Sequence, residues 1–572
     1  MILLLLSCNG EPEAEPRTLL DREACTATDP ARQLFWGDLH VHTRYSFDAW
    51  VYDVRLTPAD AYAFAMGETV QLPSGPVQLS RPLDFAAVTD HAEFLGEIDA
   101  CTREGSPAYD TPTCVDYRAG GASSVQLFGT KLAVDDPERP EDICDAADCL
   151  VLAGSVWTRT QRAAEHAYDR TSDCRFTSFV GYEWTGATGV SNYHRNVIFR
   201  NEAVPALPTS YIEEPTASGL WNALDRECLA DPLCDVLTIP HNSNLSNGNM
   251  FPADPEDAEL RASLEVLLEV YQHKGDSECR PEMLGGVLGS EDELCDFEKV
   301  RKETPEDCGE GTGFGGMVYA GCASRNDFAR GILLAGLENQ GTVNPYRLGL
   351  IASTDTHSGT PGAVEEDGWL GHLGDAEDDP EERLRDPLLN PGGNIDSPGG
   401  LIGVWADHND RDALFDAMLR REVYGTSGPR IALRFFGGDL DENLCEASDF
   451  VEQGYAGGVP MGGILNTDTF AVLAFADPLG ADLATVQIVK GWVDDEGSHI
   501  EVIDVAEGPA ASLCAVWTDP SPQPTAFYYA RVLEVETPRW STLDCETVEH
   551  ENCGQLAENI QERAWSSPIW SE

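Results

Sequence analysis

The stretch FWGDLHVHT, residues 35–43, is an apolar run that ends in two histidines one residue apart. Side chains at positions i and i+2 of a β-strand point to the same face, so His40 and His42 project to one side of the predicted strand end. Two neutral imidazoles side by side suit a divalent metal ion. The pair alone is weak evidence, because a chain with 12 histidines contains such a pair by chance.

Metal-binding residue types recur at the edges of other apolar runs. These runs lie at 81–94, 174–186, 191–200, 234–244, 264–275 and 347–362. Segments 57–66, 157–170, 257–270 and 324–338 are typical of helices. The alternation predicts an α/β fold with a parallel sheet. Metal-type residues at the carboxyl ends of strands favour a barrel, whose functional site lies on that face.

Nine nitrogen and oxygen donors with no sulfur make up the candidate set. A donor set of this kind suits zinc, manganese or iron in a catalytic site better than a structural zinc. The sequence therefore predicts a polynuclear metal site. The predicted ligands are His40, His42, Asp48, His91, Glu183, His194, His241, Asp355 and His357.

The order and spacing of these motifs resemble the polymerase and histidinol phosphatase (PHP) superfamily. The shared pattern begins with HVH, with Asp48 six residues beyond His42, and continues with TDH. It then runs through the GYE glutamate, Glu183, a histidine 11 residues later, the IPH histidine and STDTH. The resemblance implies a distorted (β/α)7 barrel that holds up to three metal ions.

A closer resemblance is to a bacterial branch of that superfamily known mainly as a domain of unknown function. This resemblance covers about residues 33–570. It indicates the family but does not identify a substrate. The stretches that carry it are YRLGLIASTDTHSGTPG (346–362), GLIGVWADHNDRDALFDAMLRREVYGTSGPRI (400–431), VPMGG (459–463) and FYYARV (527–532).

The resemblance also implies how the ligands are shared. The first metal ion would be held by His40, His42, Glu183 and Asp355; the second by Glu183, His194 and His241; the third by Asp48, His91 and His357. Asp48 is the least secure member, because it lies in the loop RYSFDAW, where this superfamily varies. His273 lies outside the nine-ligand pattern, and either contacts substrate or is a strand-end surface residue.

Our main interpretation is a metal-dependent phosphoesterase with two to three divalent ions, zinc, manganese or iron. A metal-bridged water loses its proton near neutral pH and becomes the nucleophile, and the ions stabilise the developing charge. The catalytic candidates are Glu183, Asp355, His273 and Arg195, although packing explains Arg195 equally well. Two alternatives remain open: hydrolysis of sulfate or other esters, and a non-catalytic metal-binding surface module.

The charge and apolar content of the chain narrow the classes of molecule that the protein is expected to bind. The net charge of −62 weighs against nucleic acid, whose phosphates need a basic surface. The expected substrate is instead an anionic ester, either a small molecule or a group exposed on a polymer. No stretch of 18 apolar residues follows the N-terminus, so membrane association is expected only through an N-terminal lipid anchor.

Cysteines and the first residues favour the cell envelope or secretion over the cytoplasm. MILLLLSC, residues 1–8, resembles a lipoprotein signal with Cys8 as the lipidated residue, although it lacks a basic start. Sixteen further cysteines and no CxxC motif favour disulfides over structural zinc. Close pairs that predict local loops are Cys144/Cys149, Cys228/Cys234 and Cys545/Cys553.

The chain is expected to divide into three regions. Residues 1–32 form the signal and an acidic tether, and residues 33–434 form the barrel with loop insertions at 99–156 and 275–322. Residues 435–572 contain short β-rich runs, which predict an antiparallel, sandwich-like region packed on the barrel. Trp565 and Trp570 near the end favour core packing over carbohydrate binding.

Overall fold

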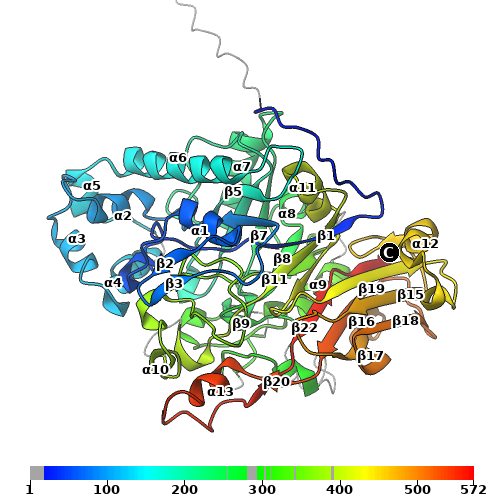
Figure 1. Ribbon diagram of the computed structural model, residues 1–572. Coiled ribbons are helices and arrows are strands. Elements are labelled where there is room, and N and C mark those ends of the chain that lie inside the picture. Colours follow the sequence, from blue (N-terminus) through cyan, green and yellow to red (C-terminus); the bar gives the residue numbers. More distant parts are fainter. Residues whose placement is uncertain are drawn as a thin grey trace, which may run out of the picture.

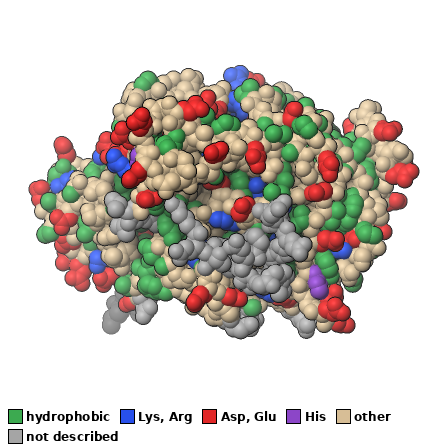
Figure 2. Space-filling view, turned by 90° about the horizontal axis from the view of Figure 1, so that it is seen from below, with side chains coloured by type: hydrophobic (Ala, Val, Ile, Leu, Met, Phe, Trp, Pro, Cys, Tyr) green, Lys and Arg blue, Asp and Glu red, His purple; other side chains and the backbone are tan. Residues whose placement is uncertain are grey.

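The computed structural model describes residues 19–571 apart from 135, 254, 280–292, 302–304, 310, 340–342 and 388–391. The predicted lipidation site, Cys8, and most of the predicted tether therefore lie outside the described residues. Figure 1 shows helices from the first third of the chain gathered on one side of the molecule and the C-terminal strands on the other. The face in Figure 2 carries acidic side chains spread widely and few basic ones, as the net charge of −62 requires.

The largest sheet in the described residues is mixed and has 12 strands. Along the sheet its strands are β17 (Gly497–Ala510), β16 (Leu483–Asp494), β19 (Ala526–Glu534), β22 (Arg563–Ser566), β12 (Val423–Thr426), β11 (Leu401–Ala406), β1 (Gln33–Asp38), β4 (Phe85–Val88), β5 (Thr177–Trp184), β6 (Arg195–Phe199) and β7 (Val236–Pro240), with β23 (Ile569–Ser571) paired to β19. Every residue of β4 and β5 is buried, which explains the continuous apolar sequence FAAV of β4 and the mostly apolar sequence of β5.

Smaller sheets complete the β-structure. One contains β10 (Gly349–Ala352), β8 (Leu267–Gln272) and β9 (Gly275–Asp276), with β10 parallel to β8. A four-stranded antiparallel sheet contains β14 (Gly458–Pro460), β13 (Ala432–Gly438), β15 (Thr469–Phe475) and β18 (Ser512–Thr518). Two-stranded sheets pair β2 (Val70–Leu72) with β3 (Gly75–Val77) and β20 (Thr537–Pro538) with β21 (Asn559–Ile560).

The helices are short apart from α6. They are α1 (Pro58–Ala65), α2 (Leu95–Thr102), α3 (Pro112–Tyr117), α4 (Ala122–Leu132), α5 (Glu141–Ala146), α6 (Cys149–Ala167), α7 (Ala217–Leu224), α8 (Ala258–Leu264), α9 (Ala329–Glu338), α10 (Pro380–Arg383), α11 (Arg411–Leu419), α12 (Phe450–Gly457) and α13 (Trp540–Cys545). Thr57 and Asp60 form a capping box that starts α1. None of the helices in the described ranges has the length and apolarity needed to cross a membrane.

The structure corrects three expectations about the first 434 residues. The predicted (β/α)7 barrel is not found as a closed ring in the described part of the chain, because the main sheet ends at β7 while β8 and β10 belong to a separate sheet. Strands β5 and β6 pair antiparallel, since residues 185–194 between them are too few for the helical crossover that a parallel pair needs. The first predicted loop insertion, 99–156, contains helices α3, α4 and α5 rather than irregular loops.

The C-terminal region is β-rich and antiparallel, as the sequence predicts, and it shares the main sheet. β22 pairs with β12 on one side and with β19 on the other. The four-stranded sheet packs against β19, where the rings of Phe470 and Tyr528 lie 4.2 Å apart. Trp565 and Trp570 are fully buried, so their packing leaves no indole face for a sugar.

Eight disulfides join the 16 cysteines that the sequence marks as a disulfide framework. They include the three local pairs predicted from spacing, Cys144–Cys149, Cys228–Cys234 and Cys545–Cys553. The other five are Cys25–Cys174, Cys101–Cys114, Cys279–Cys295, Cys308–Cys322 and Cys445–Cys514. This many disulfides indicates an oxidising compartment, either extracellular or in the cell envelope.

Candidate metal centre

The predicted ligands converge because their strands end at one place. His40 and His42 follow β1, and His91 follows β4, while Glu183 lies near the end of β5. Isolated parallel bridges join Val41 to Thr356 and His91 to Glu183, and hold neighbouring loops in register. The remaining ligands come from the starts or ends of other strands: His194 before β6, His241 after β7, and Asp355 and His357 after β10.

Four side chains form the first group. His40, His42, Glu183 and Asp355 are buried, and one donor atom from each lies within 4.8 Å of the others. Nε2 of His40 lies 3.2 Å from Oε2 of Glu183 and 3.0 Å from Oδ1 of Asp355. Nε2 of His42 lies 3.1 Å from each of the same two oxygens. Two imidazole nitrogens thus face two carboxylate oxygens around one point.

The carboxylate of Glu183 lies between two sets of histidines, and each of its two oxygens faces one set. Its Oε1 lies 2.7 Å from Nδ1 of His194 and 3.5 Å from Nε2 of His241. Its Oε2 faces His40 and His42, and lies 3.4 Å from Nδ1 of His91. A carboxylate placed in this way is suited to bridging two cations.

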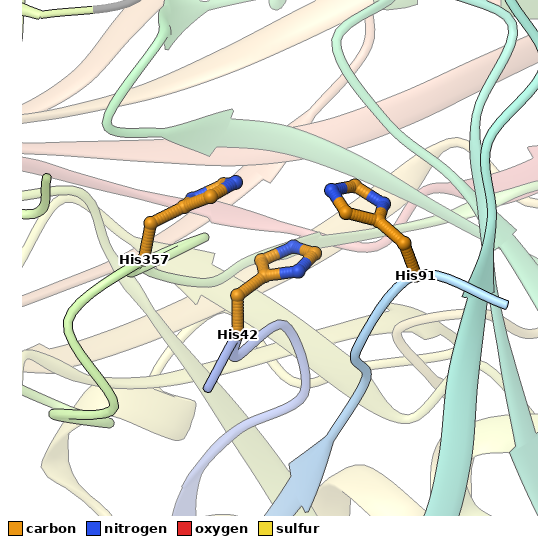
Figure 3. Close-up of side chains that lie close together, drawn as sticks. All are labelled: His42, His91 and His357. Carbon is orange, nitrogen blue, oxygen red and sulfur yellow. The ribbon is translucent and has the colours of Figure 1, made fainter. Parts of the chain in front are cut away.

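Asp48 reaches the cluster from its loop. Its Oδ2 lies 3.1 Å from Nε2 of His91 and 3.4 Å from Nε2 of His357. Figure 3 shows the rings of His42, His91 and His357 turned toward a common space, and their donor atoms form a further compact group. All nine predicted ligands therefore lie in one connected cluster, the histidine–carboxylate cluster.

The cluster has the properties that a divalent metal ion requires. Nε2 of His42, Nε2 of His194 and Oδ1 of Asp355 are buried and make no hydrogen bond of acceptable geometry within the described residues. Buried polar atoms normally have a partner, and metal coordination would satisfy these. The donors are nitrogen and oxygen without sulfur, a set that transition metals and zinc accept.

The protonation states of His42 and His194 also favour metal binding, whereas at His40 and His91 the nearby carboxylates outweigh burial and raise the pKa, so that a metal ion would have to displace a proton there. Burial, reinforced by the charges of His357 and His91, lowers the pKa of His42 to about 3, and burial lowers that of His194 to about 4. Both imidazoles are then neutral near pH 7, the form that binds metals. Burial alone would raise the pKa of Glu183, but the surrounding histidines outweigh it and hold the carboxylate ionised.

Sequence reasoning missed a carboxylate that supports the cluster. Glu269, in the middle of β8, places both carboxylate oxygens 3.2 Å from Nδ1 of His40. A carboxylate on the second ring nitrogen fixes the tautomer and orientation of a ligating histidine. The available signal was Glu269 itself, the only charged residue of β8 (LLEVYQ), a strand whose residues are all buried.

His273 lies beside the cluster. Its Nε2 is 3.4 Å from Oδ2 of Asp355, and its Nδ1 is 2.9 Å from Oδ2 of Asp396. The ring is completely buried, so the surface interpretation of His273 is wrong. The ammonium of Lys274 forms an ion pair with Asp355, and therefore adds a positive charge at the edge of the cluster.

Arg195, a catalytic candidate from the sequence, faces away from the cluster. Its Nε donates to Glu265 at 2.7 Å and its Nη1 donates to the carbonyl of Tyr193 at 2.6 Å. The guanidinium is buried, and lies 4.3 Å from the ring centre of Tyr193. These contacts give Arg195 a packing role, because β6 turns its side chain to the opposite face from its neighbour.

Comparisons with known proteins give a family and a distant structure. No curated protein matches the chain. A solved structure from Bacteroides vulgatus, a two-domain protein containing a predicted PHP-like metal-dependent phosphoesterase, shares 10% identity with a TM-score of 0.29, over 91% of this chain and 95% of its own. A sequence family described as a protein of unknown function, DUF3604, matches residues 29–512 and 506–572. The chain therefore belongs to the DUF3604 family.

Proposed function

We propose that the protein is a metal-dependent phosphoesterase whose centre is the histidine–carboxylate cluster. The observation that carries the proposal is the position of Glu183, whose two oxygens each face a different set of histidines. We also propose that the chain belongs to the PHP superfamily, on the strength of the motif order from HVH to STDTH.

We propose that the nine residues divide into the sets that the resemblance implies. His40, His42, Glu183 and Asp355 would hold one ion, Glu183 with His194 and His241 a second, and Asp48, His91 and His357 a third. We propose zinc, manganese or iron as the metal. When bound, these ions would supply Lewis acidity, which activates water and stabilises negative charge on a transferring group.

The protein's own residues would then orient the centre and its substrate. Glu269 fixes the ring of His40, and Asp396 fixes the ring of His273. Because His273 and Lys274 border Asp355, we propose that they contact the anionic ester as it enters. A local positive charge is needed there, since the protein as a whole repels anions with a net charge of −62.

Substrate and location are proposed from the same features. The substrate is an anionic ester, either a small molecule or a group exposed on a polymer, and nucleic acid is unsuited because of the acidic surface. Eight disulfides favour a secreted or cell-envelope protein, and we propose Cys8 as a lipid anchor.

A panel of chromogenic esters tests the proposal. The purified protein would be stripped with a chelator, reloaded with manganese, zinc or iron, and assayed on phosphomonoesters, phosphodiesters and sulfate esters. We expect metal-dependent hydrolysis of a phosphoester. Hydrolysis of sulfate esters alone would show that the protein cleaves a sulfate ester and not a phosphoester. Metal binding without hydrolysis of any ester would show that the cluster is a non-catalytic metal-binding module.

A further inference from the structure

A second polar cavity lies where the loop 362–367 meets the ends of β19 and β22. Its volume is about 470 Å³, and none of the nine residues of the histidine–carboxylate cluster lines it. Four glutamates line it, of which Glu365 is exposed and the other three, Glu366, Glu534 and Glu562, are not. We call this set the glutamate cavity.

Two of these glutamates face each other across neighbouring strands. Leu533 pairs with Arg563, and the backbone N–H of Glu534 donates to the carbonyl of Glu562 at 2.8 Å. Opposed residues in an antiparallel pair put their side chains on the same face, about 5 Å apart at Cβ. Glu534 is 1% exposed and Glu562 is 4% exposed, so two acidic residues oppose each other in a buried place.

The carboxylates of the glutamate cavity are not fully satisfied. Oε1 of Glu534 and Oε1 of Glu366 are buried without a hydrogen-bond partner in the described part of the chain. Oε2 of Glu534 accepts only a long bond, 3.3 Å, from the N–H of Ala481. Glu562 accepts from the hydroxyl of Ser427. A buried acceptor without a donor normally indicates a missing ligand or a proton.

The arginines around the cavity are engaged elsewhere. Arg81 binds both oxygens of Asp477, at 2.8 and 2.6 Å. Arg430 donates to the carbonyls of Arg81 and Pro82. Arg539 binds both oxygens of Glu298 at 2.8 and 2.7 Å. Within the described residues, no direct ion pair therefore neutralises the three glutamates, although the nearby charge of Arg539 partly offsets the burial of Glu366.

Burial makes the ionised form of all three glutamates costly without a counter-ion. It raises the pKa of Glu534 to about 7 and that of Glu366 to about 8, and it raises that of Glu562, with the charge of Glu366 adding to the effect. Either bound protons or a bound cation removes this cost. The cavity is large enough to hold a cation with coordinated water.

We propose that Glu366, Glu534 and Glu562 bind a hard divalent cation of the Ca²⁺ type, at a site separate from the histidine–carboxylate cluster. Carboxylate oxygens without nitrogen or sulfur donors suit Ca²⁺ and not the metals that prefer imidazole. The cation would tie the loop 362–367, which follows the STDTH motif, to the ends of β19 and β22. The site would stabilise the fold and does not depend on the proposed phosphoesterase activity.

Calcium binding to the full chain near neutral pH tests this inference. Equilibrium dialysis against CaCl₂ with elemental analysis, and the melting temperature with and without Ca²⁺, would be measured for four proteins. They are the wild type, Glu534→Gln/Glu562→Gln, the control Glu452→Gln on an exposed position of α12, and His42→Ala in the histidine–carboxylate cluster.

We expect a single Ca²⁺ per chain in the wild type, in Glu452→Gln and in His42→Ala, together with a Ca²⁺-dependent rise in melting temperature. The double variant should lose this Ca²⁺ or bind it at least about 10-fold more weakly. If the double variant does not fold, the single variants Glu366→Gln and Glu534→Gln give the same comparison.

Three results would overturn the proposal: no Ca²⁺ bound by the wild type, equal binding by the wild type and the glutamine variants, or loss of Ca²⁺ in His42→Ala with retention in the double variant. The first of these would mean that protons alone neutralise the glutamates. None of these results bears on ester hydrolysis, which the ester panel tests separately.

Discussion

Glu269 lies among apolar neighbours on β8, and its carboxylate faces Nδ1 of His40. We predict that Glu269→Gln lowers metal affinity by about 10- to 100-fold, the usual cost of losing a partner behind a metal ligand. The amide keeps the shape of the side chain and removes its charge. Chelator competition measures the affinity, and circular dichroism checks that the fold is retained.

Arg195→Ala, unlike Glu269→Gln, should affect the stability of the fold and not the metal content. Its guanidinium pairs with buried Glu265 and not with the histidine–carboxylate cluster. We expect an unchanged metal content and a loss of about 3–5 kcal/mol in stability, because a buried carboxylate loses a partner. Arg261 also pairs with Glu265 at 2.9 Å. Because this pair remains in the variant, we expect the loss of stability to be about 3 kcal/mol, the lower end of that range. Metal loss in Arg195→Ala with normal stability would contradict this packing role.

Residue chemistry alone predicts much of the cluster. Eight of the nine predicted ligands belong to short motifs beside strand ends, and Asp48 lies in the loop RYSFDAW, so their positions along the chain carry the signal. Glu269 and Asp396 belong to no such motif, and only the packing of β8 and of the loop before β11 brings them to His40 and His273. Supporting residues are therefore harder to predict than ligands.

At the scale of elements, the position of strands is predictable from apolar runs, but their partners are not. The runs at 81–94 and 174–186 contain β4 and β5, and these pair in parallel as expected. The antiparallel β5–β6 pair depends on the short connection 185–194, and β8 joins β10 across a long stretch of chain. Sheet closure depends on such distant pairings, which periodicity does not encode.

The disulfides close loops of very different length, and they should therefore stabilise the fold by different amounts. Cys25–Cys174 closes a loop of 149 residues, whereas Cys144–Cys149 closes one of 5. In the chain-entropy model the first stabilises the fold by about 5 kcal/mol and the second by about 2 kcal/mol. We therefore expect Cys25→Ser/Cys174→Ser to lower the free energy of unfolding more than Cys144→Ser/Cys149→Ser. Denaturant unfolding measures both, and the reverse order would contradict the assigned pairing.

At the scale of the whole molecule, Glu278 joins the two halves of the chain. Its carboxylate accepts hydrogen bonds from Arg330 on α9 at 2.8 Å and from Tyr529 on β19 at 2.6 Å. It also accepts from Trp565 on β22 at 2.7 Å and from Arg531 on β19 at 3.2 Å. The β-rich C-terminal region is thus held to the rest by a buried charge network as well as by the β12–β22 pair.

This network predicts a loss of stability in acid. Burial raises the pKa of Glu278, but Arg531 and Arg330 outweigh it and hold the pKa below the ordinary glutamate value of 4.5. The stabilisation is therefore complete above about pH 4.5 and is lost progressively as the pH falls below that value.

Glu278→Gln should cost about 3–5 kcal/mol at neutral pH and flatten the acid limb of the stability curve, with metal content unchanged. Thermal unfolding as a function of pH measures both effects. An acid limb identical in the wild type and the variant would contradict the role assigned to Glu278.

We expect the histidine–carboxylate cluster to be a metal centre built around Glu183. Elemental analysis of the dialysed wild type and of Glu183→Gln tests it most directly, with circular dichroism to confirm folding. A neutral amide is a poorer ligand than a carboxylate, so two sites should weaken together. We predict about two to three divalent ions per wild-type chain and a loss of most of them in Glu183→Gln. Equal metal content in the two folded proteins would mean that Glu183 is not a shared metal ligand.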